Sequence, residues 1–184
     1  MSSVNLYLRG VYLYYAMDTS VLAETAQRTV SKAILAADES SGTIQKRFDT
    51  INATSTPELN LVYRQILFTS PDIEDYISGV ILFDETIRQS TDSGIPIPTL
   101  LRDKGIVPGI KVDKGAKNIP GKSPDSYTQG IDELGSRLKE YKQLGAGFAK
   151  WRAVITIEGN KYPSEVAIER NAQDLALYAL LCQE

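Results

Sequence analysis

Apolar residues follow a repeating order along this chain. A stretch with apolar positions three and four residues apart is followed by a short continuous apolar run and then a polar loop, and the order repeats from Asp18 onward. This order predicts parallel βα units, because parallel strands need a crossover that is usually a helix. The strands are predicted at 34–37, 79–83, 106–112 and 147–155.

Helices are predicted before, between and after these strands. The first covers about 19–32, and the second is opened by Thr56 and Pro57. Short helical pieces are expected after Asp84 and Pro98, and a last helix after Ser164. The second helix is expected to bury its apolar positions, which are Leu61, Val62, Ile66 and Leu67.

The number of units bounds the fold class. About four βα units are half of a closed (β/α)8 TIM barrel, which needs eight units and roughly 250 residues. We therefore predict an α/β fold of the TIM-barrel class, with residues 1–17 as an N-terminal extension and 18–184 as a partial barrel domain. A small doubly wound sheet is the alternative, but no glycine-rich phosphate loop follows the first strand. The polar segment 113–130 is predicted to be a long functional loop.

Composition removes several classes of function. The 184 residues carry a net charge of -3, no histidine and one cysteine, Cys182. Histidine triads and zinc sites are therefore not expected, nor is a nucleic-acid or membrane partner, since the chain has no general positive field. No stretch approaches the ~20 apolar residues of a membrane span. Any anion must be bound locally.

Charged residues occur at the ends of three predicted strands. Asp38 follows the first, Lys111 and Asp113 end the third, and Lys150 and Arg152 lie in the fourth. In a parallel barrel, the carboxyl ends of the strands carry the active site. Each pair, two residues apart, shares one strand face, whereas Trp151 faces the other way and is expected to pack against a helix. Solvated edge charges explain one such pair, but three coinciding cases favour a shared pocket.

The loop after the first strand leads directly into a helix. Ser40 and Thr43 carry hydroxyls at this helix start, and Arg47 lies one turn inside. This arrangement suits an anion, yet a capped helix with a solvated arginine fits the spacing equally well. A lysine beside another cation also permits Schiff-base chemistry, and the spacing does not say which lysine would react.

Four segments, in order along the chain, resemble the class I fructose-1,6-bisphosphate aldolases. The resemblance runs from about Leu22 to the end and is carried by ILAADESSGTIQKR (34–47), GVILFDET (79–86), GIKVDKG (109–115) and FAKWR (148–152). It implies a (β/α)8 barrel and reversible cleavage of fructose 1,6-bisphosphate to dihydroxyacetone phosphate and glyceraldehyde 3-phosphate in glycolysis. This lyase chemistry runs through a lysine Schiff base, without metal or other cofactor.

The resemblance also implies roles for seven residues. Asp38 matches the aspartate that positions and polarises the substrate hydroxyls, Lys150 the lysine that stabilises negative charge, and Lys111 a lysine close to it. The positions that match the substrate phosphate contacts are Ser40, Thr43, Arg47 and Arg152. At Asn60 and Leu61 the family often carries two arginines, so this chain departs from the pattern there.

By the family pattern, the Schiff-base lysine lies beyond Glu184. We therefore expect this chain alone to be inactive, and a non-catalytic phosphosugar-binding or interaction fragment is the alternative. Another phosphosugar lyase or isomerase on a similar barrel is a third hypothesis. The family resemblance further implies a homotetramer in the cytoplasm, with a plastid as the alternative location.

Overall fold

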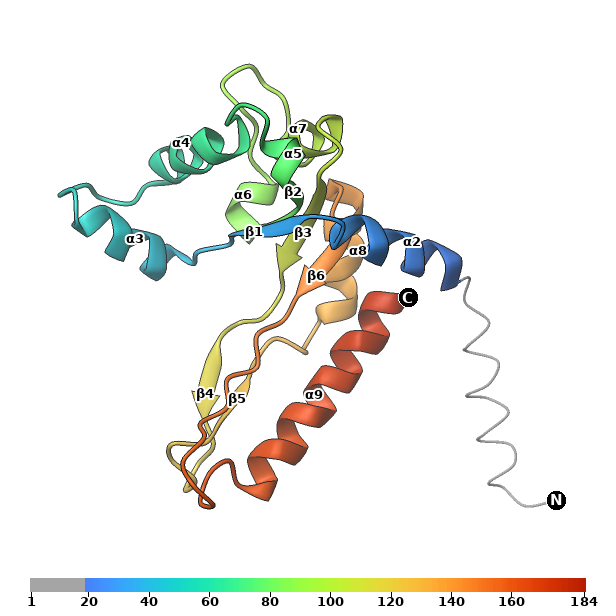
Figure 1. Ribbon diagram of the computed structural model, residues 1–184. Helices are drawn as coiled ribbons and strands as arrows, with labels where there is room; N and C mark the ends of the chain where they lie inside the picture. The colour runs from blue at the N-terminus through green and yellow to red at the C-terminus, as the bar shows by residue number, and fades with distance from the viewer. Residues whose placement is uncertain (1–18) are drawn as a thin grey trace.

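The computed structural model describes residues 19–184 and contains a four-stranded parallel sheet (Figure 1). Its strands pair in chain order, which confirms the prediction of parallel βα units. The strands are β1 (Ala33–Ala37), β2 (Ile77–Leu82), β3 (Val107–Lys111) and β6 (Phe148–Lys150). The predicted extension, residues 1–17, lies outside the described residues, and the domain boundary at residue 18 stays a prediction.

Helices connect the strands as the apolar spacing predicts. Thr56 accepts a hydrogen bond from the Leu59 amide and Ser164 accepts one from the Ala167 amide, so both predicted capping residues begin their helices. The helices are α2 (Thr19–Thr29), α3 (Ser41–Asp49), α4 (Pro57–Phe68), α5 (Ile73–Tyr76), α6 (Asp84–Ile87), α7 (Ile97–Asp103), α8 (Leu134–Leu144) and α9 (Glu165–Gln183).

The core lies between the sheet and the helices. Val80, Leu82 and Ile110 on the central strands are almost completely buried. Gly109 is paired with Phe148 in the β3–β6 ladder, and a Cβ atom added at Gly109 would lie 2.2 Å from the Phe148 ring. Only glycine therefore lets this ring pack against β3, and the contact helps to hold β6 in register.

The predicted buried face of α4 is partly wrong. Val62 and Ile66 are 49% and 64% exposed, and the buried positions of the helix are Asn60, Arg64 and Phe68. The reason is a buried polar group. The fully buried guanidinium of Arg64 donates hydrogen bonds to acceptors on neighbouring elements, so the helix face that carries Arg64 is turned inward. Amphipathic spacing alone could not predict this, because it counts arginine as a surface residue.

The segment predicted as a long loop contains a hairpin. β4 (Ala116–Asn118) and β5 (Ser126–Thr128) pair in antiparallel fashion and extend away from the sheet beside α9 (Figure 1). The fourth strand is also shorter than predicted, since β6 ends at Lys150. Beyond it, the hydroxyls of Ser126 and Thr128 donate to the carbonyls of Val154 and Arg152 and replace a strand ladder.

Candidate active site

One cavity of about 890 Å³ opens at the carboxyl ends of the parallel strands. All seven residues predicted for the site line it, so the fold brings them together at one cavity. They are Asp38, Ser40, Thr43, Arg47, Lys111, Lys150 and Arg152. The convergence follows from topology, because strands in a parallel sheet all end at the same edge.

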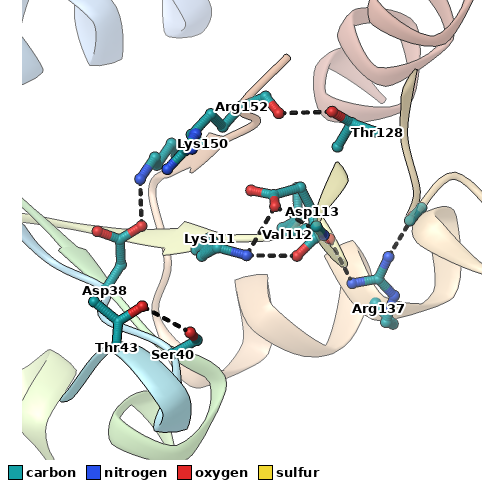
Figure 2. Close-up of polar contacts among 12 residues, drawn as sticks. Asp38, Ser40, Thr43, Lys111, Val112, Asp113, Thr128, Arg137, Lys150 and Arg152 are labelled. Carbon is teal, nitrogen blue, oxygen red and sulfur yellow. Dashed lines mark hydrogen bonds and ion pairs between the residues drawn. The ribbon is translucent and has the colours of Figure 1, made fainter. Parts of the chain in front are cut away.

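Asp38 and Lys150 form an ion pair that joins the first and last strands of the sheet (Figure 2). The aspartate side chain is 9% exposed and the lysine side chain 29%. Burial would disfavour either charge alone, so each stabilises the other. The carboxylate of the pair can accept a hydrogen bond from a hydroxyl group. The neighbouring ammonium can stabilise a negatively charged oxygen.

Lys111 pairs with Asp113 at the end of β3. The lysine Nζ donates to the carboxylate Oδ1 of Asp113 at 2.9 Å and to its carbonyl at 2.7 Å, and the Gly115 amide donates to the same carboxylate oxygen (Figure 2). The second carboxylate oxygen, Oδ2, is buried without a partner among the described residues. Residues at the end of the same strand thus hold the Lys111 ammonium at the cavity wall.

The loop after β1 presents hydroxyls at the start of α3. Ser40 occupies the N-cap position without a capping hydrogen bond from its side chain, and its Oγ lies 3.2 Å from Oγ1 of Thr43. Arg47 pairs with Glu39 at 3.1 Å and is 56% exposed. The Ser40 side chain therefore does not cap the helix, and both Ser40 and Thr43 line the cavity.

Arg152 lies beside Lys150 on the cavity side of the chain (Figure 2). No carboxylate among residues 19–184 forms an ion pair with its guanidinium. Trp151, between the two cations, packs against the core and lies 5.5 Å from the Tyr178 ring of α9. The alternation predicted for this strand end, with cations inward to the cavity and the indole away from it, is confirmed.

A second group of cavity residues was missed by the sequence analysis. Asp84 lies two residues beyond the end of β2, and it accepts hydrogen bonds from Tyr141 at 2.8 Å and from Arg88 at 2.9 Å. Arg88 also pairs with Glu140. The position of Asp84 at a strand end was a usable signal, although it was interpreted only as a helix start. Tyr141 and Glu140 lie on α8 and gave no such signal.

These contacts shift two acid–base equilibria. Burial raises the pKa of Tyr141, and its hydrogen bond to Asp84 raises it further. For Asp84, burial acts to raise the pKa, but hydrogen bonds from Arg88 and Tyr141 outweigh it and hold the pKa below the ordinary value of 3.8. Asp84 is therefore an anion and Tyr141 a neutral donor at neutral pH.

Arg64 supports the first loop from behind. Its guanidinium donates to the Glu39 carbonyl at 2.7 Å, to Thr86 Oγ1 at 2.6 Å and to Glu85 at 3.2 Å. Burial lowers the pKa of Arg64, and the charges of Glu39 and Glu85 oppose that shift. Asn60, where the family often carries arginine, donates to Glu85 in the same network and does not line the cavity.

Within residues 19–184, no group of three or more His, Cys, Asp and Glu side chains has an arrangement that could hold a metal ion. In the same range, no helix combines the length and the apolar character needed to cross a membrane.

The fold and the site together define a class: α/β proteins of the parallel-barrel type with a cation-rich pocket at the carboxyl ends of the strands. Comparison with known proteins gives the family. The family model described as fructose-bisphosphate aldolase class-I matches residues 21–184, and this chain belongs to that family. Its resemblance to this family and its TIM-barrel fold class are thereby confirmed.

Several relatives show how much of the family this chain contains. It is 54% identical to a probable class 1 aldolase of Xylella fastidiosa over 170 residues, which are 91% of this chain and 51% of the relative. It is 51% identical to cytosolic aldolase 5 of Arabidopsis thaliana, over 85% of this chain and 43% of the relative. The chain spans about half the length of such relatives.

A solved structure agrees with these comparisons. The aldolase of Plasmodium falciparum, solved in complex with TRAP and a small-molecule inhibitor, matches with a TM-score of 0.86 at 48% identity. The match covers 90% of this chain and 48% of that one. The half-barrel arrangement of Figure 1 is therefore the arrangement of an aldolase over the matched part.

Proposed function

We propose that the cavity binds fructose 1,6-bisphosphate and forms the phosphate-binding side of a class I aldolase site. The observation that carries the proposal is the charge of the cavity. Cationic side chains outnumber carboxylates along its wall by seven to five, so two positive charges lack a lining carboxylate. The cations are Arg47, Arg88, Lys111, Lys114, Arg137, Lys150 and Arg152, and the anions are Asp38, Glu39, Asp84, Asp113 and Glu140. A bound phosphate would neutralise the surplus.

The proposed roles come from the family resemblance, and the shared cavity supports them. Asp38 holds and polarises the substrate hydroxyls, and Lys150 stabilises the negative charge that develops when the carbon–carbon bond breaks. Lys111 lies in the same cavity and adds to this field. Ser40, Thr43, Arg47 and Arg152 form charge-assisted hydrogen bonds to phosphate.

The proposal places the Schiff-base lysine in the part of the relatives that this chain does not match. The lysine would hold the substrate carbonyl carbon as an iminium and take up the electron pair of the breaking bond. The products would be dihydroxyacetone phosphate and glyceraldehyde 3-phosphate.

Calorimetric titration tests the binding half of the proposal. We expect fructose 1,6-bisphosphate to bind this chain and fructose to bind far more weakly, because the surplus charge recognises phosphate. Arg152→Gln should weaken bisphosphate binding by about 10- to 100-fold, the effect of one lost charge-assisted hydrogen bond of about 1.5–3 kcal/mol. Lys142→Met is the control, since Lys142 is exposed on α8 and does not line the cavity. Equal affinities for fructose and its bisphosphate would contradict the proposal.

Borohydride trapping tests the catalytic half. With fructose 1,6-bisphosphate and borohydride, we expect no covalent adduct on this chain alone. A mixture of this chain with a polypeptide carrying the unmatched part of the Xylella fastidiosa relative should form an adduct on the added polypeptide and cleave the substrate. A stoichiometric adduct on this chain alone would contradict the assignment.

Two alternatives have distinct outcomes in these experiments. A non-catalytic phosphosugar-binding fragment would bind the bisphosphate but restore no cleavage in the mixture. Another phosphosugar lyase would cleave fructose 1-phosphate or sedoheptulose bisphosphate faster than fructose 1,6-bisphosphate in the same assay.

Assembly and location belong to the same proposal. We propose a homotetramer in the cytoplasm; relatives in Arabidopsis thaliana and Pisum sativum that are named cytosolic or cytoplasmic support the location. Sedimentation of the reconstituted mixture would measure the assembly, and a monomeric barrel would contradict it.

A further inference from the structure

Arg137 on α8 spans two backbone segments at the edge of the cavity (Figure 2). One nitrogen of its guanidinium, Nη1, donates to the Val112 carbonyl at 3.0 Å, and the other, Nη2, donates to the Gly130 carbonyl. Within residues 19–184, no carboxylate forms an ion pair with it. The two guanidinium nitrogens thus hold backbone carbonyls, while the charge of Arg137 also acts to lower the pKa values of Asp84 and Tyr141.

The two segments that Arg137 joins are pressed together. The Lys114 amide donates to the Gln129 carbonyl at 2.7 Å, and the Gln129 amide donates to the Gly115 carbonyl at 3.0 Å. A Cβ atom at Gly130 would lie 3.0 Å from the Lys114 nitrogen and 3.1 Å from the Val112 oxygen, and φ at Gly130 is +130°. Glycine is thus required where the end of the hairpin meets the end of β3.

Val112 lies between the two charged residues of that strand end. Lys111 and Asp113 both line the cavity, and the Lys111 ammonium bonds the carbonyl and the carboxylate of Asp113. Whatever fixes the Val112 carbonyl therefore fixes the peptide unit that joins Val112 to Asp113, the residue that accepts from the Lys111 ammonium. Arg137 therefore acts on the Lys111 ammonium through the backbone of Val112 and Asp113.

The same hairpin end also holds the neighbouring strand. Thr128 is 1% exposed, and its hydroxyl donates to the Arg152 carbonyl at 2.8 Å (Figure 2). Residues 128–130 thus contact the backbone beside Lys111 and the backbone of Arg152. The hairpin, which lies in the segment predicted to be a long functional loop, thus connects two of the segments that bring cations to the cavity.

We propose that Arg137 is a positioning residue: by clamping the hairpin end onto β3, it sets the place of the Lys111 ammonium in the cavity. The relevance of this place to substrate rests on the proposed function, whereas the clamp itself does not. Arg137 is not proposed to touch the substrate.

The test compares Arg137→Met with Arg137→Lys in the full 184-residue chain. Methionine keeps the aliphatic stem and removes both donors, whereas lysine keeps a charged donor. Two readouts need no substrate: amide hydrogen exchange at Lys114, and the rate at which an amine-acylating reagent labels Lys111 relative to Lys142. Arg28→Met is the control, because Arg28 is exposed on α2, away from the cavity.

For Arg137→Met we expect both rates to rise about tenfold, which corresponds to about 1.4 kcal/mol, since the loss of both donors allows the segment to open locally. In Arg137→Lys, the logarithm of each rate should rise by no more than half as much as in Arg137→Met. Arg28→Met should change neither rate. The proposal is overturned if Arg137→Met leaves both rates unchanged. It is also overturned if all slow amides accelerate together, because Arg137 would then only stabilise the fold as a whole.

Substrate binding provides the link to function. Arg137→Met should weaken fructose 1,6-bisphosphate binding by about five- to tenfold, with partial rescue by lysine. Failure of the unsubstituted chain to bind the bisphosphate would defeat the proposed function, and the two substrate-free rates would still decide whether Arg137 is a clamp. If Arg137→Met speeds the labelling of Lys111 but leaves the affinity for fructose 1,6-bisphosphate unchanged, the positioning role is overturned.

Discussion

The two lysine–aspartate pairs of the cavity are built in opposite ways. Lys111 and Asp113 are two residues apart on one strand end, whereas Lys150 and Asp38 are separated by 112 positions and join opposite edges of the sheet. Asp113 also receives the Gly115 amide, and Asp38 has no second side-chain or loop donor among the described residues. The first pair forms whenever its strand end folds, while the second requires the whole sheet.

This difference separates local geometry from tertiary structure. A pair within one strand end reports only the conformation of a few residues. A pair between β1 and β6 reports that the intervening βα units are packed in register. The second pair is therefore the more sensitive probe of the fold. Substitutions in or next to this pair should lower the free energy of unfolding more than substitutions in the first pair.

Removal of the support behind Asp38 should have the largest effect. Arg64→Met leaves the Glu39 carbonyl and Glu85 without the buried guanidinium, so the free energy of unfolding should fall by about 3 kcal/mol in urea denaturation. Arg47→Met is the matched control, because it pairs with the Glu39 carboxylate at a side chain that is 56% exposed. It should cost no more than about 0.5 kcal/mol. Equal losses would show that Arg64 has no special role behind the first loop.

Substitution of the two lysines compares the pairs directly. Lys150→Met should lower the free energy of unfolding by about 2 kcal/mol, because Asp38 is left buried without its counter-charge. Lys111→Met should cost about 1 kcal/mol, since Asp113 keeps the Gly115 amide. Urea denaturation of both variants under one buffer condition measures the difference. The reverse order would refute the distinction between the local and the long-range pair.

The smallest expected effect is a pH dependence at Asp84. Its pKa is held below the ordinary value, so the stability that its ionised form contributes is present above that ordinary value and is lost as the pH falls through the lowered pKa. Asp84→Asn should remove at most about 0.5 kcal/mol at pH 6, because the side chain is 49% exposed. The difference between the two proteins should shrink as the pH is lowered towards 2. A difference that grows on acidification would contradict the sign of the shift.

The strands and the charged residues at the strand ends were within reach of the sequence for one physical reason, whereas Ser40, Thr43 and Arg47 were assigned to the site only through the family resemblance. Apolar runs mark buried strands, and the polar residue that follows such a run must lie at the carboxyl edge of a parallel sheet. Asp38, Lys111 and Lys150 each follow or end an apolar run, so no knowledge of packing was needed to bring them together. The same rule would have found Asp84 after β2.

Other parts depend on information that a single sequence does not carry. The strands of the hairpin are three residues each, and Ala116–Asn118 is exposed throughout, so it has no apolar alternation to reveal it. Arg137 belongs to the cavity only because α8 is rotated to face the end of β3, and spacing along the helix does not determine that rotation. Arg64 is buried because three acceptors from other segments meet it, which is a tertiary property.

The most direct test of the account is a map of where a phosphosugar binds. Titration of fructose 1,6-bisphosphate into the isotopically labelled 184-residue chain, followed by NMR, should shift the amides of 38–43, 111–115 and 150–152 with a single binding curve. Lys150→Met and Arg152→Gln should weaken that curve without moving it to other residues. Saturable shifts that lie elsewhere on the chain and leave these three segments unchanged would contradict the convergence of the strand ends on one phosphate-binding pocket.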